Sequence, residues 1–122
     1  MNVQGFHCVW DIVLKDSAVL KDASILDNFF REALKKSGFS IIGNIIHKFT
    51  SEGEGITGVY LLSGSHLAFH TYPESNYISI DVYTCGRADT TIYHAIEEFF
   101  SASKSILMRT IDRGSLVSNS MS

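Results

Sequence analysis

The middle of the chain brings together the side-chain types that nucleophilic and acid–base chemistry uses. Residues 62–86 (LSGSHLAFHTYPESNYISIDVYTCG) contain a hydroxyl at Ser65, imidazoles at His66 and His70, and a thiol at Cys85. A hydroxyl or thiol beside an imidazole is the arrangement by which proteins activate a nucleophile. For Cys85 a buried structural thiol is the competing interpretation, because an unmodified cysteine packs like a small apolar residue.

A predicted hairpin brings these groups close together. Residues 73–76 (PESN) have the composition of a turn, so Tyr72 is expected opposite Tyr77, and the pairing continues outward along both strands. This register places Cys85 within about one strand spacing of the Gly64–Ser65 peptide bond.

The two faces of this hairpin differ in character. One face is apolar and is expected in the core: Leu67, Phe69, Ile78, Ile80 and Val82. The other is polar, aromatic and ionisable: His66, His70, Tyr72, Tyr77, Asp81, Tyr83 and Cys85. This pattern leaves two alternatives open, a solvated outer face and a partly covered face at a dimer interface or a site.

The two histidines of this face do not predict a metal site. On a strand, the H-x-x-x-H spacing of His66 and His70 separates the imidazoles by about 13 Å, and no cysteine or carboxylate completes a ligand set. We therefore expect no bound metal.

The surrounding elements predict one layered domain. Strands are expected at residues 6–14, 39–50, 57–63, 66–72, 77–84 and 105–111, and helices at 22–37 and 89–104. Ser24 and Asp27 resemble a capping box in the first helix, and the second is expected to turn Ile92, Ala95, Ile96, Phe99 and Phe100 inward. This order predicts an α+β fold, a two-layer sandwich of a mainly antiparallel sheet with two helices on one face.

Length and charge exclude several classes of protein. A chain of 122 residues corresponds to a single domain, residues 1–122. Its net charge of −3 and the absence of a clustered basic patch argue against nucleic-acid binding. No apolar run is long enough to span a membrane, no secretory signal pattern is present, and the two cysteines make no disulfide framework. A cytoplasmic protein is expected.

Taken together, these motifs resemble one family. The residues that carry the likeness are Gly5-x-His7, His47-Lys48-Phe49, Ser65-His66, His70-Thr71-x-Pro73-Glu74 and Asp81-x-x-Thr84-Cys85-Gly86. In spacing, length and element order the chain resembles the small prokaryotic S-adenosylmethionine decarboxylase proenzymes over about residues 5–112.

The resemblance implies that the chain is a precursor that cuts itself between Gly64 and Ser65. The Ser65 hydroxyl would attack the Gly64 carbonyl, and elimination would leave a β chain (residues 1–64) and an α chain (residues 65–122) that begins with a pyruvoyl group. That self-generated cofactor would bind the substrate amine and accept electrons as carbon dioxide leaves. The implied activity is decarboxylation of S-adenosylmethionine to the aminopropyl donor for spermidine synthesis.

The resemblance also implies residue roles. His70 would be the base in self-cleavage, assisted by the hydroxyl of Thr57, and Cys85 would protonate the product carbon. For the substrate, Phe49 would stack on adenine and Glu74 would bind the ribose hydroxyls. Tyr72 occupies a substrate-binding position at which the family commonly has Trp.

The resemblance also implies a homodimer, which resolves a conflict of distance. Along a straight strand His70 and Ser65 lie about 16 Å apart, so His70 does not easily serve the Ser65 of its own chain. In the family the active site lies between two subunits. We therefore expect a homodimer with shared active sites, in which His70, Thr57, Phe49 and Glu74 serve the partner's Ser65 and Cys85.

Three departures from the family pattern keep alternatives open. Thr57 replaces Ser, Tyr72 replaces Trp, and Gly64 stands where Glu usually precedes the cleaved serine. One alternative is a pyruvoyl-dependent decarboxylase of ornithine or arginine, which the presence of Phe49 and Glu74 disfavours. Another is an unprocessed, inactive homologue that binds a ligand or a partner enzyme, which Gly64 favours.

Overall fold

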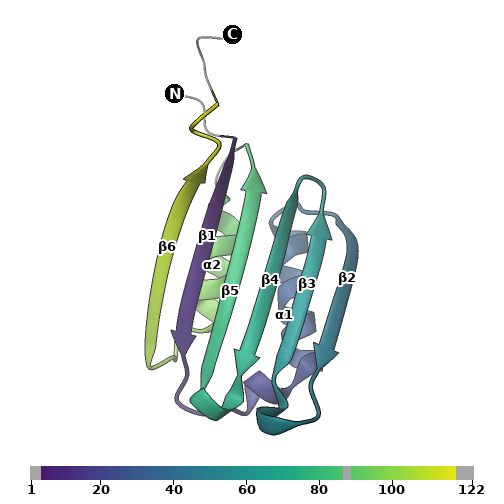
Figure 1. The fold of residues 1–122 in the computed structure, drawn as a ribbon, viewed down its shortest axis with the longest axis vertical. Coiled ribbons are helices and arrows are strands. Elements are labelled where there is room, and N and C mark those ends of the chain that lie inside the picture. The colour runs from purple at the N-terminus through teal and green to yellow at the C-terminus, as the bar shows by residue number, and fades with distance from the viewer. Residues whose placement is uncertain (1–3, 87–88, 118–122) are drawn as a thin grey trace.

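The structure, a computed structural model, describes residues 4–86 and 89–117. The described residues form six strands and two helices, which are labelled in Figure 1. The strands are β1 (Gly5–Val13), β2 (Ile41–Lys48), β3 (Ile56–Leu62), β4 (Ser65–Tyr72), β5 (Tyr77–Cys85) and β6 (Ser105–Arg113). The helices are α1 (Ala23–Lys36) and α2 (Thr90–Phe99), and three short 3-10 turns lie at Val19–Lys21, Glu52–Glu54 and Pro73–Ser75.

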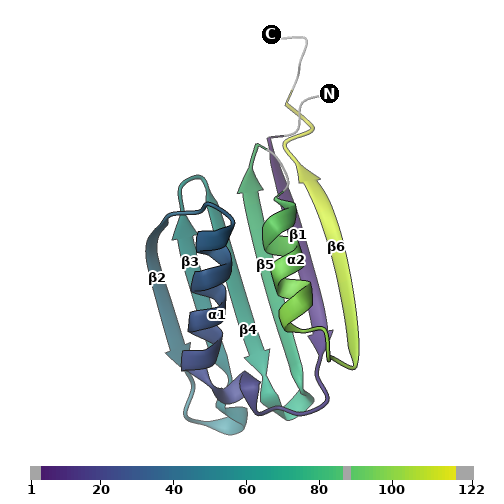
Figure 2. The ribbon, with the colours of Figure 1, turned by 180° about the vertical axis from the view of Figure 1, so that it is seen from behind.

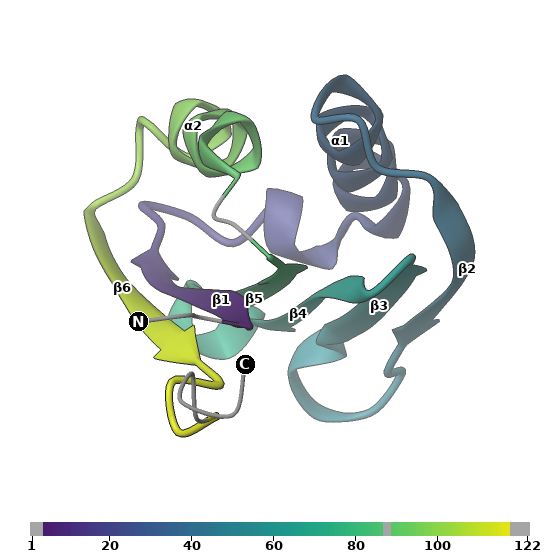
Figure 3. The same ribbon diagram turned by 90° about the horizontal axis from the view of Figure 1, so that it is seen from above.

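All six strands form one antiparallel sheet in the order β2-β3-β4-β5-β1-β6. Both helices cover the same face of the sheet, α1 over β2–β4 and α2 over β5 and β1 (Figure 2), and Figures 1 and 3 show the opposite face without a covering layer. We call this uncovered surface the open face. The predicted two-layer α+β sandwich is confirmed.

The predicted β4–β5 register is also confirmed. Tyr72 lies opposite Tyr77 and His66 opposite Tyr83. The side chains expected in the core are fully buried between sheet and helices: Leu67, Phe69, Ile78, Ile80 and Val82. Cys8 and Trp10 of β1 join the same core.

Both helices differ from the sequence prediction at their ends. The N-cap of α1 is Asp22, whose carboxylate accepts the Ile25 backbone N–H, so the capping box expected at Ser24 and Asp27 is wrong. Asp27 is engaged in tertiary contacts instead.

Helix α2 ends at Phe99 and not at residue 104, because the chain must turn back for Lys104 N–H to reach the Val13 carbonyl beside β6. Phe99, expected to face inward, is 38% exposed and stacks on Phe29.

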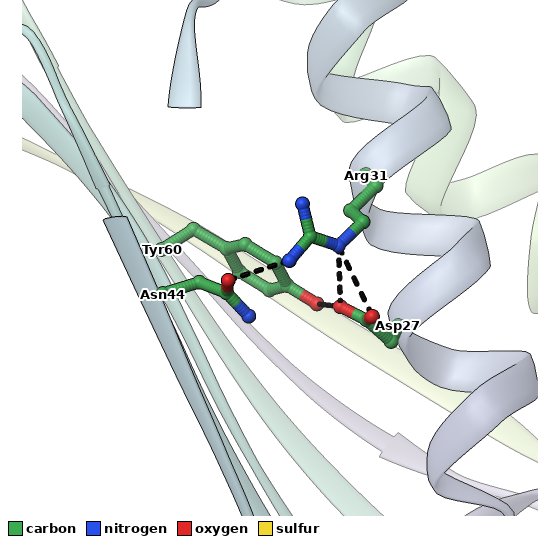
Figure 4. Close-up of polar contacts among 4 residues, drawn as sticks. All are labelled: Asp27, Arg31, Asn44 and Tyr60. Atoms are coloured by element: carbon green, nitrogen blue, oxygen red, sulfur yellow. Dashed lines mark hydrogen bonds and ion pairs between the residues drawn. The ribbon is translucent and has the colours of Figure 1, made fainter. Parts of the chain in front are cut away.

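A polar network connects α1 to the sheet (Figure 4). Tyr60 of β3 donates a hydrogen bond to the Asp27 carboxylate at 2.5 Å, and Arg31 Nε donates to the same carboxylate at 3.1 Å. The Arg31 guanidinium also donates to the side chain of Asn44 on β2. Because the Tyr60 ring is fully buried, its hydroxyl needs such a partner. The network therefore fixes α1 over β2 and β3.

Neither helix in the described part of the chain has the length and apolar character needed to cross a membrane.

The open face displays exposed apolar residues on β2 and β3. Ile45, Val59 and Leu61 are 74%, 42% and 54% exposed. Leu107 and Ile111 of β6 are exposed at the opposite edge. Apolar surface of this extent is typical of an interaction face.

Candidate active site

Ser65 and Cys85 meet at one end of the sheet, where β3 and β5 end and β4 begins (Figure 1). The backbone N–H of Cys85 donates a hydrogen bond to Ser65 Oγ at 3.1 Å. Ser65 is nearly buried, whereas the Cys85 side chain is exposed. The predicted proximity of this serine and this cysteine is confirmed.

Gly64 forms the turn that connects β3 to Ser65. Its φ of +69° lies in the left-handed region, which glycine adopts without steric cost. A Cβ built on Gly64 would lie 3.4 Å from Cys85 Cβ, which is an ordinary contact. The peptide bond before Ser65 therefore lies in a tight turn directly against Cys85.

The other end of the sheet holds a cavity of about 390 Å³. It is lined by Phe49, Ser51, Gly55, Ile56, Thr57, His70, Thr71, Tyr72 and Glu74. The residues predicted to bind the substrate, the predicted base of self-cleavage and the threonine that assists it all line this cavity: Phe49, Thr57, His70, Tyr72 and Glu74.

Within this cavity, His70 and Thr57 are paired. Thr57 Oγ1 lies 3.0 Å from His70 Nδ1, across the β3–β4 pairing in which the two residues face each other. This bond occupies one ring nitrogen. The other, Nε2, is left to exchange a proton, as a histidine base requires.

Two aromatic side chains offer open faces at the cavity. Phe49 is 46% exposed and Tyr72 is 43% exposed. Tyr72 is held by stacking on Tyr77, with ring centroids 5.4 Å apart, and Phe49 by an edge contact with His47 at 4.5 Å. Such surfaces suit a planar, cationic or aromatic ligand.

Sequence reasoning missed Thr71, which supports the cavity from behind. Its hydroxyl accepts the Ile56 N–H at 2.8 Å and donates to the Leu20 carbonyl at 2.9 Å. Gly55 lies so close that a Cβ there would be 2.7 Å from the Thr71 carbonyl oxygen. A signal was present in the sequence. Thr71 continues the inward-facing series of Leu67 and Phe69, and a polar residue at such a position needs buried hydrogen-bond partners.

The predicted site residues thus form two separate groups within one chain. Ser65 begins β4, whereas His70 lies towards its other end. Their side chains also start on opposite faces of the sheet, because the positions differ by an odd number of residues along one strand. The single chain therefore brings Gly64, Ser65 and Cys85 together, and His70 with the cavity residues, but does not join the two groups.

A ring cluster lies between these groups on the open face. His66 stacks on Tyr83 with ring centroids 5.7 Å apart, and the His7 ring meets both rings edge-on. Burial lowers the pKa of His66, and the nearby His7 lowers it further by electrostatic repulsion. A neutral imidazole is thereby favoured beside the Ser65 backbone. Among residues 4–86 and 89–117, no group of three or more His, Cys, Asp or Glu side chains is arranged to hold a metal ion.

Comparisons with known proteins agree on one family. The family model described as S-adenosylmethionine decarboxylase matches residues 6–114. The S-adenosylmethionine decarboxylase proenzyme of Geobacillus kaustophilus is 41% identical over 92 residues, covering 75% of this chain and 73% of the relative. That of Prochlorococcus marinus (strain MIT 9211) is 32% identical over 120 residues, covering 96% and 97%.

The fold gives the same result. The crystal structure of the adenosylmethionine decarboxylase from Aquifex aeolicus superposes with a TM-score of 0.82 at 26% identity, covering 98% of this chain and 97% of that one. The resemblance seen in the sequence motifs is confirmed: the chain belongs to the S-adenosylmethionine decarboxylase family.

Proposed function

We propose that this protein is a carboxy-lyase that removes carbon dioxide from S-adenosylmethionine, using a pyruvoyl group that it makes from its own Ser65. The observation that carries the proposal is the contact of Ser65 with Cys85 at the Gly64 turn, in a chain of this family. The product would be the aminopropyl donor for spermidine synthesis.

Self-cleavage begins at the Gly64 turn. Ser65 Oγ attacks the Gly64 carbonyl carbon, forming a C–O bond as the C–N peptide bond breaks and leaving the Ser65 amine free. A base then removes the Ser65 α-proton, the ester carboxylate leaves, and hydrolysis of the resulting enamine releases ammonia. Gly64 has no side chain to shield its carbonyl, and its φ of +69° is one that glycine adopts without steric cost.

Residues around Ser65 fit the pyruvoyl group that this cleavage would produce. Such a group supplies the ketone that a decarboxylase needs as an electron sink. The Cys85 N–H, which now donates to Ser65 Oγ, is a polar partner at this position. The exposed Cys85 thiol is the neighbouring proton donor, and we assign it to protonation of the product carbon.

The cavity suits the substrate that the relatives' names indicate. Adenine is a planar ring for the exposed faces of Phe49 and Tyr72, and a sulfonium cation is attracted to the same aromatic faces. The Glu74 carboxylate, at the rim, is an acceptor for the ribose hydroxyls.

A homodimer would unite the two groups of site residues. The open face carries exposed Ile45, Val59 and Leu61 beside the cavity, which supports packing against a second copy. In that dimer, His70, Thr57, Phe49, Tyr72 and Glu74 of one protomer would act on Ser65 and Cys85 of its partner. The separation of Ser65 from His70 along β4 supports this arrangement.

The two alternatives find no support in the comparisons. The relatives reported above are named for S-adenosylmethionine and not for ornithine or arginine. An inactive homologue was suggested by Gly64, yet Gly64 has no side chain to shield the scissile carbonyl, and even a Cβ there would make only an ordinary contact with Cys85.

The test is the intact mass under denaturing conditions, followed by release of labelled carbon dioxide from carboxyl-labelled S-adenosylmethionine, ornithine and arginine. We expect fragments corresponding to residues 1–64 and 65–122, the second blocked to N-terminal sequencing, and turnover of S-adenosylmethionine alone. A chain that stays at 13.5 kDa after long incubation would overturn self-cleavage. Cleavage with turnover of only ornithine or arginine would overturn the substrate.

A further inference from the structure

The loop between β2 and β3 contacts Glu74 at a glycine. Gly53 lies in the turn Glu52–Glu54, and Glu74 lies in the turn Pro73–Ser75 that connects β4 to β5. A Cβ built on Gly53 would lie 2.7 Å from Glu74 Oε1, 2.9 Å from Cδ and 3.1 Å from Oε2. The Glu74 carboxylate therefore occupies the space that any other residue at position 53 would need.

This contact adjoins the cavity. The loop that carries Gly53 is closed by the Phe49 N–H, which donates to the Gly55 carbonyl at 2.8 Å. Phe49, Gly55 and Glu74 all line the cavity. A change in the Glu74 side chain at this point therefore alters the rim at which a ligand would enter.

The Glu74 side chain is exposed, and its carboxylate lies in the space beside Gly53. No hydrogen bond or ion pair joins it to another residue of the described part of the chain. Lys48, at the end of β2, is engaged elsewhere, because its Nζ donates to the Lys21 carbonyl at 2.7 Å and lies 3.9 Å from Glu54. The carboxylate oxygens are thus available to a ligand.

We infer that Gly53 is a positioning residue for substrate binding: its missing side chain lets the Glu74 carboxylate lie at the cavity rim, where it accepts hydrogen bonds from the substrate's vicinal hydroxyls. The inference rests on the proposed function. A side chain at position 53 meets the flexible end of Glu74 and not backbone, so the carboxylate swings away while the fold is retained.

The test compares two glycines of the same backbone conformation. Gly53 has φ +79° and Gly38, at the end of α1, has φ +86°, but a Cβ on Gly38 would meet nothing within 4 Å. Gly53→Ala and Gly38→Ala therefore impose similar backbone strain, and only the first displaces Glu74. We expect Gly53→Ala to raise KM for S-adenosylmethionine about tenfold, as loss of a charged hydrogen bond does. Gly38→Ala should leave KM unchanged.

Three further measurements separate positioning from a general structural effect. In Gly53→Ala, kcat and the extent of self-cleavage should stay within about twofold of wild type, because Glu74 is assigned to the substrate's hydroxyls and not to the reacting atoms. In a Glu74→Ala background, where no carboxylate remains to displace, Gly53→Ala should raise KM no further than Gly38→Ala does. Adding Glu74→Asp to Gly53→Ala should recover part of the lost affinity, because the shorter side chain clears the new methyl group.

Equal KM values for Gly53→Ala and Gly38→Ala would overturn the inference, as would an additive effect of Gly53→Ala in the Glu74→Ala background. Either result would leave the proposed function intact, since wild-type protein would still turn over the substrate. If wild-type protein is cleaved but does not turn over S-adenosylmethionine, the proposed function fails before this comparison is made.

Discussion

Thr57 Oγ1 lies 3.0 Å from His70 Nδ1, and this pairing decides which nitrogen of the histidine is available for chemistry. When Nδ1–H donates to the threonine oxygen, the lone pair of the imidazole is on Nε2. That tautomer is the one in which Nε2 accepts a proton. Thr57 is therefore expected to orient His70 as the base of self-cleavage.

Replacing Thr57 tests this orientation. Thr57→Val keeps the shape of the side chain but removes the acceptor, and self-cleavage should slow by about tenfold or more, because a base that is no longer oriented transfers protons poorly. Thr57→Ser is the matched control and should cleave at close to the wild-type rate. Gel densitometry of freshly refolded precursor gives both rates, and equal rates for the Val and Ser variants would show that the contact has no role in cleavage.

Mixing two inactive variants tests whether the site is shared between protomers. Ser65→Ala and His70→Ala should each fail to process and fail to decarboxylate. After the two are unfolded and refolded together, half of the dimers are mixed and each mixed dimer has one complete site, so about a quarter of wild-type activity should return.

The control for this mixture is the Ser65→Ala/His70→Ala double variant refolded with Ser65→Ala, in which no complete site forms in any dimer. It should remain inactive. Recovery in neither mixture, with dimers present by size-exclusion chromatography, would place the whole site within one protomer.

The two cysteines should differ sharply in reactivity. Cys85 is exposed, whereas Cys8 is fully buried in the core. A thiol reagent should therefore label one cysteine of the native precursor rapidly, and Cys85→Ser should abolish this fast phase. Cys8 should react only after denaturation. Rapid labelling of both thiols in native protein would contradict the packing of β1.

The state of Cys8 should also appear in the pH dependence of stability. Burial, and then the charge of Glu97, raises the pKa of Cys8 from 9.0 to about 12. The folded state therefore holds this proton more tightly than the unfolded chain does. Its contribution to stability is fully present below pH 9 and is lost as the pH rises towards 12. Urea unfolding from pH 8 to 11 should show a shallower alkaline decline for Cys8→Ala than for wild type.

Two buried tyrosines offer a matched test of the network in Figure 4. Tyr60 donates to Asp27 at 2.5 Å, and burial together with that bond raises its pKa. Tyr60→Phe should lower the free energy of unfolding by about 1–3 kcal/mol, because the Asp27 carboxylate loses one of its two donors and keeps only Arg31. Tyr93→Phe is the control. The Tyr93 hydroxyl is buried and finds no partner in the described part of the chain, so its removal should be neutral or stabilising. Denaturant unfolding of both variants gives the comparison.

Local pattern was sufficient to predict the hairpin that carries the chemistry. The PESN turn and the alternation of Leu67 and Phe69 with His66 and His70 set both the register and the faces of β4 and β5. A one-residue slip would have exposed the apolar set, and so this register is strongly specified.

What the sequence did not predict depends on contacts between distant segments. The insertion of β1 between β5 and β6 follows from no local signal, since an edge position would satisfy the same alternation. Ser24 and Asp27 were predicted to form a capping box in α1 because of their three-residue spacing, but Asp27 accepts from Tyr60, which is 33 residues away. The seating of Glu74 against Gly53 likewise appears only when two separate turns meet.

The position of β1 has a consequence for what self-cleavage would leave behind. A break between Gly64 and Ser65 divides the chain into one piece with β1, β2 and β3 and another with β4, β5 and β6. The sheet order interleaves them, with β1 of the first piece hydrogen-bonded on both sides to strands of the second. Strands of both pieces therefore belong to one continuous sheet, and neither piece has a complete core of its own. The cut protein would therefore unfold as one unit, and its separated pieces would regain structure only by folding onto each other.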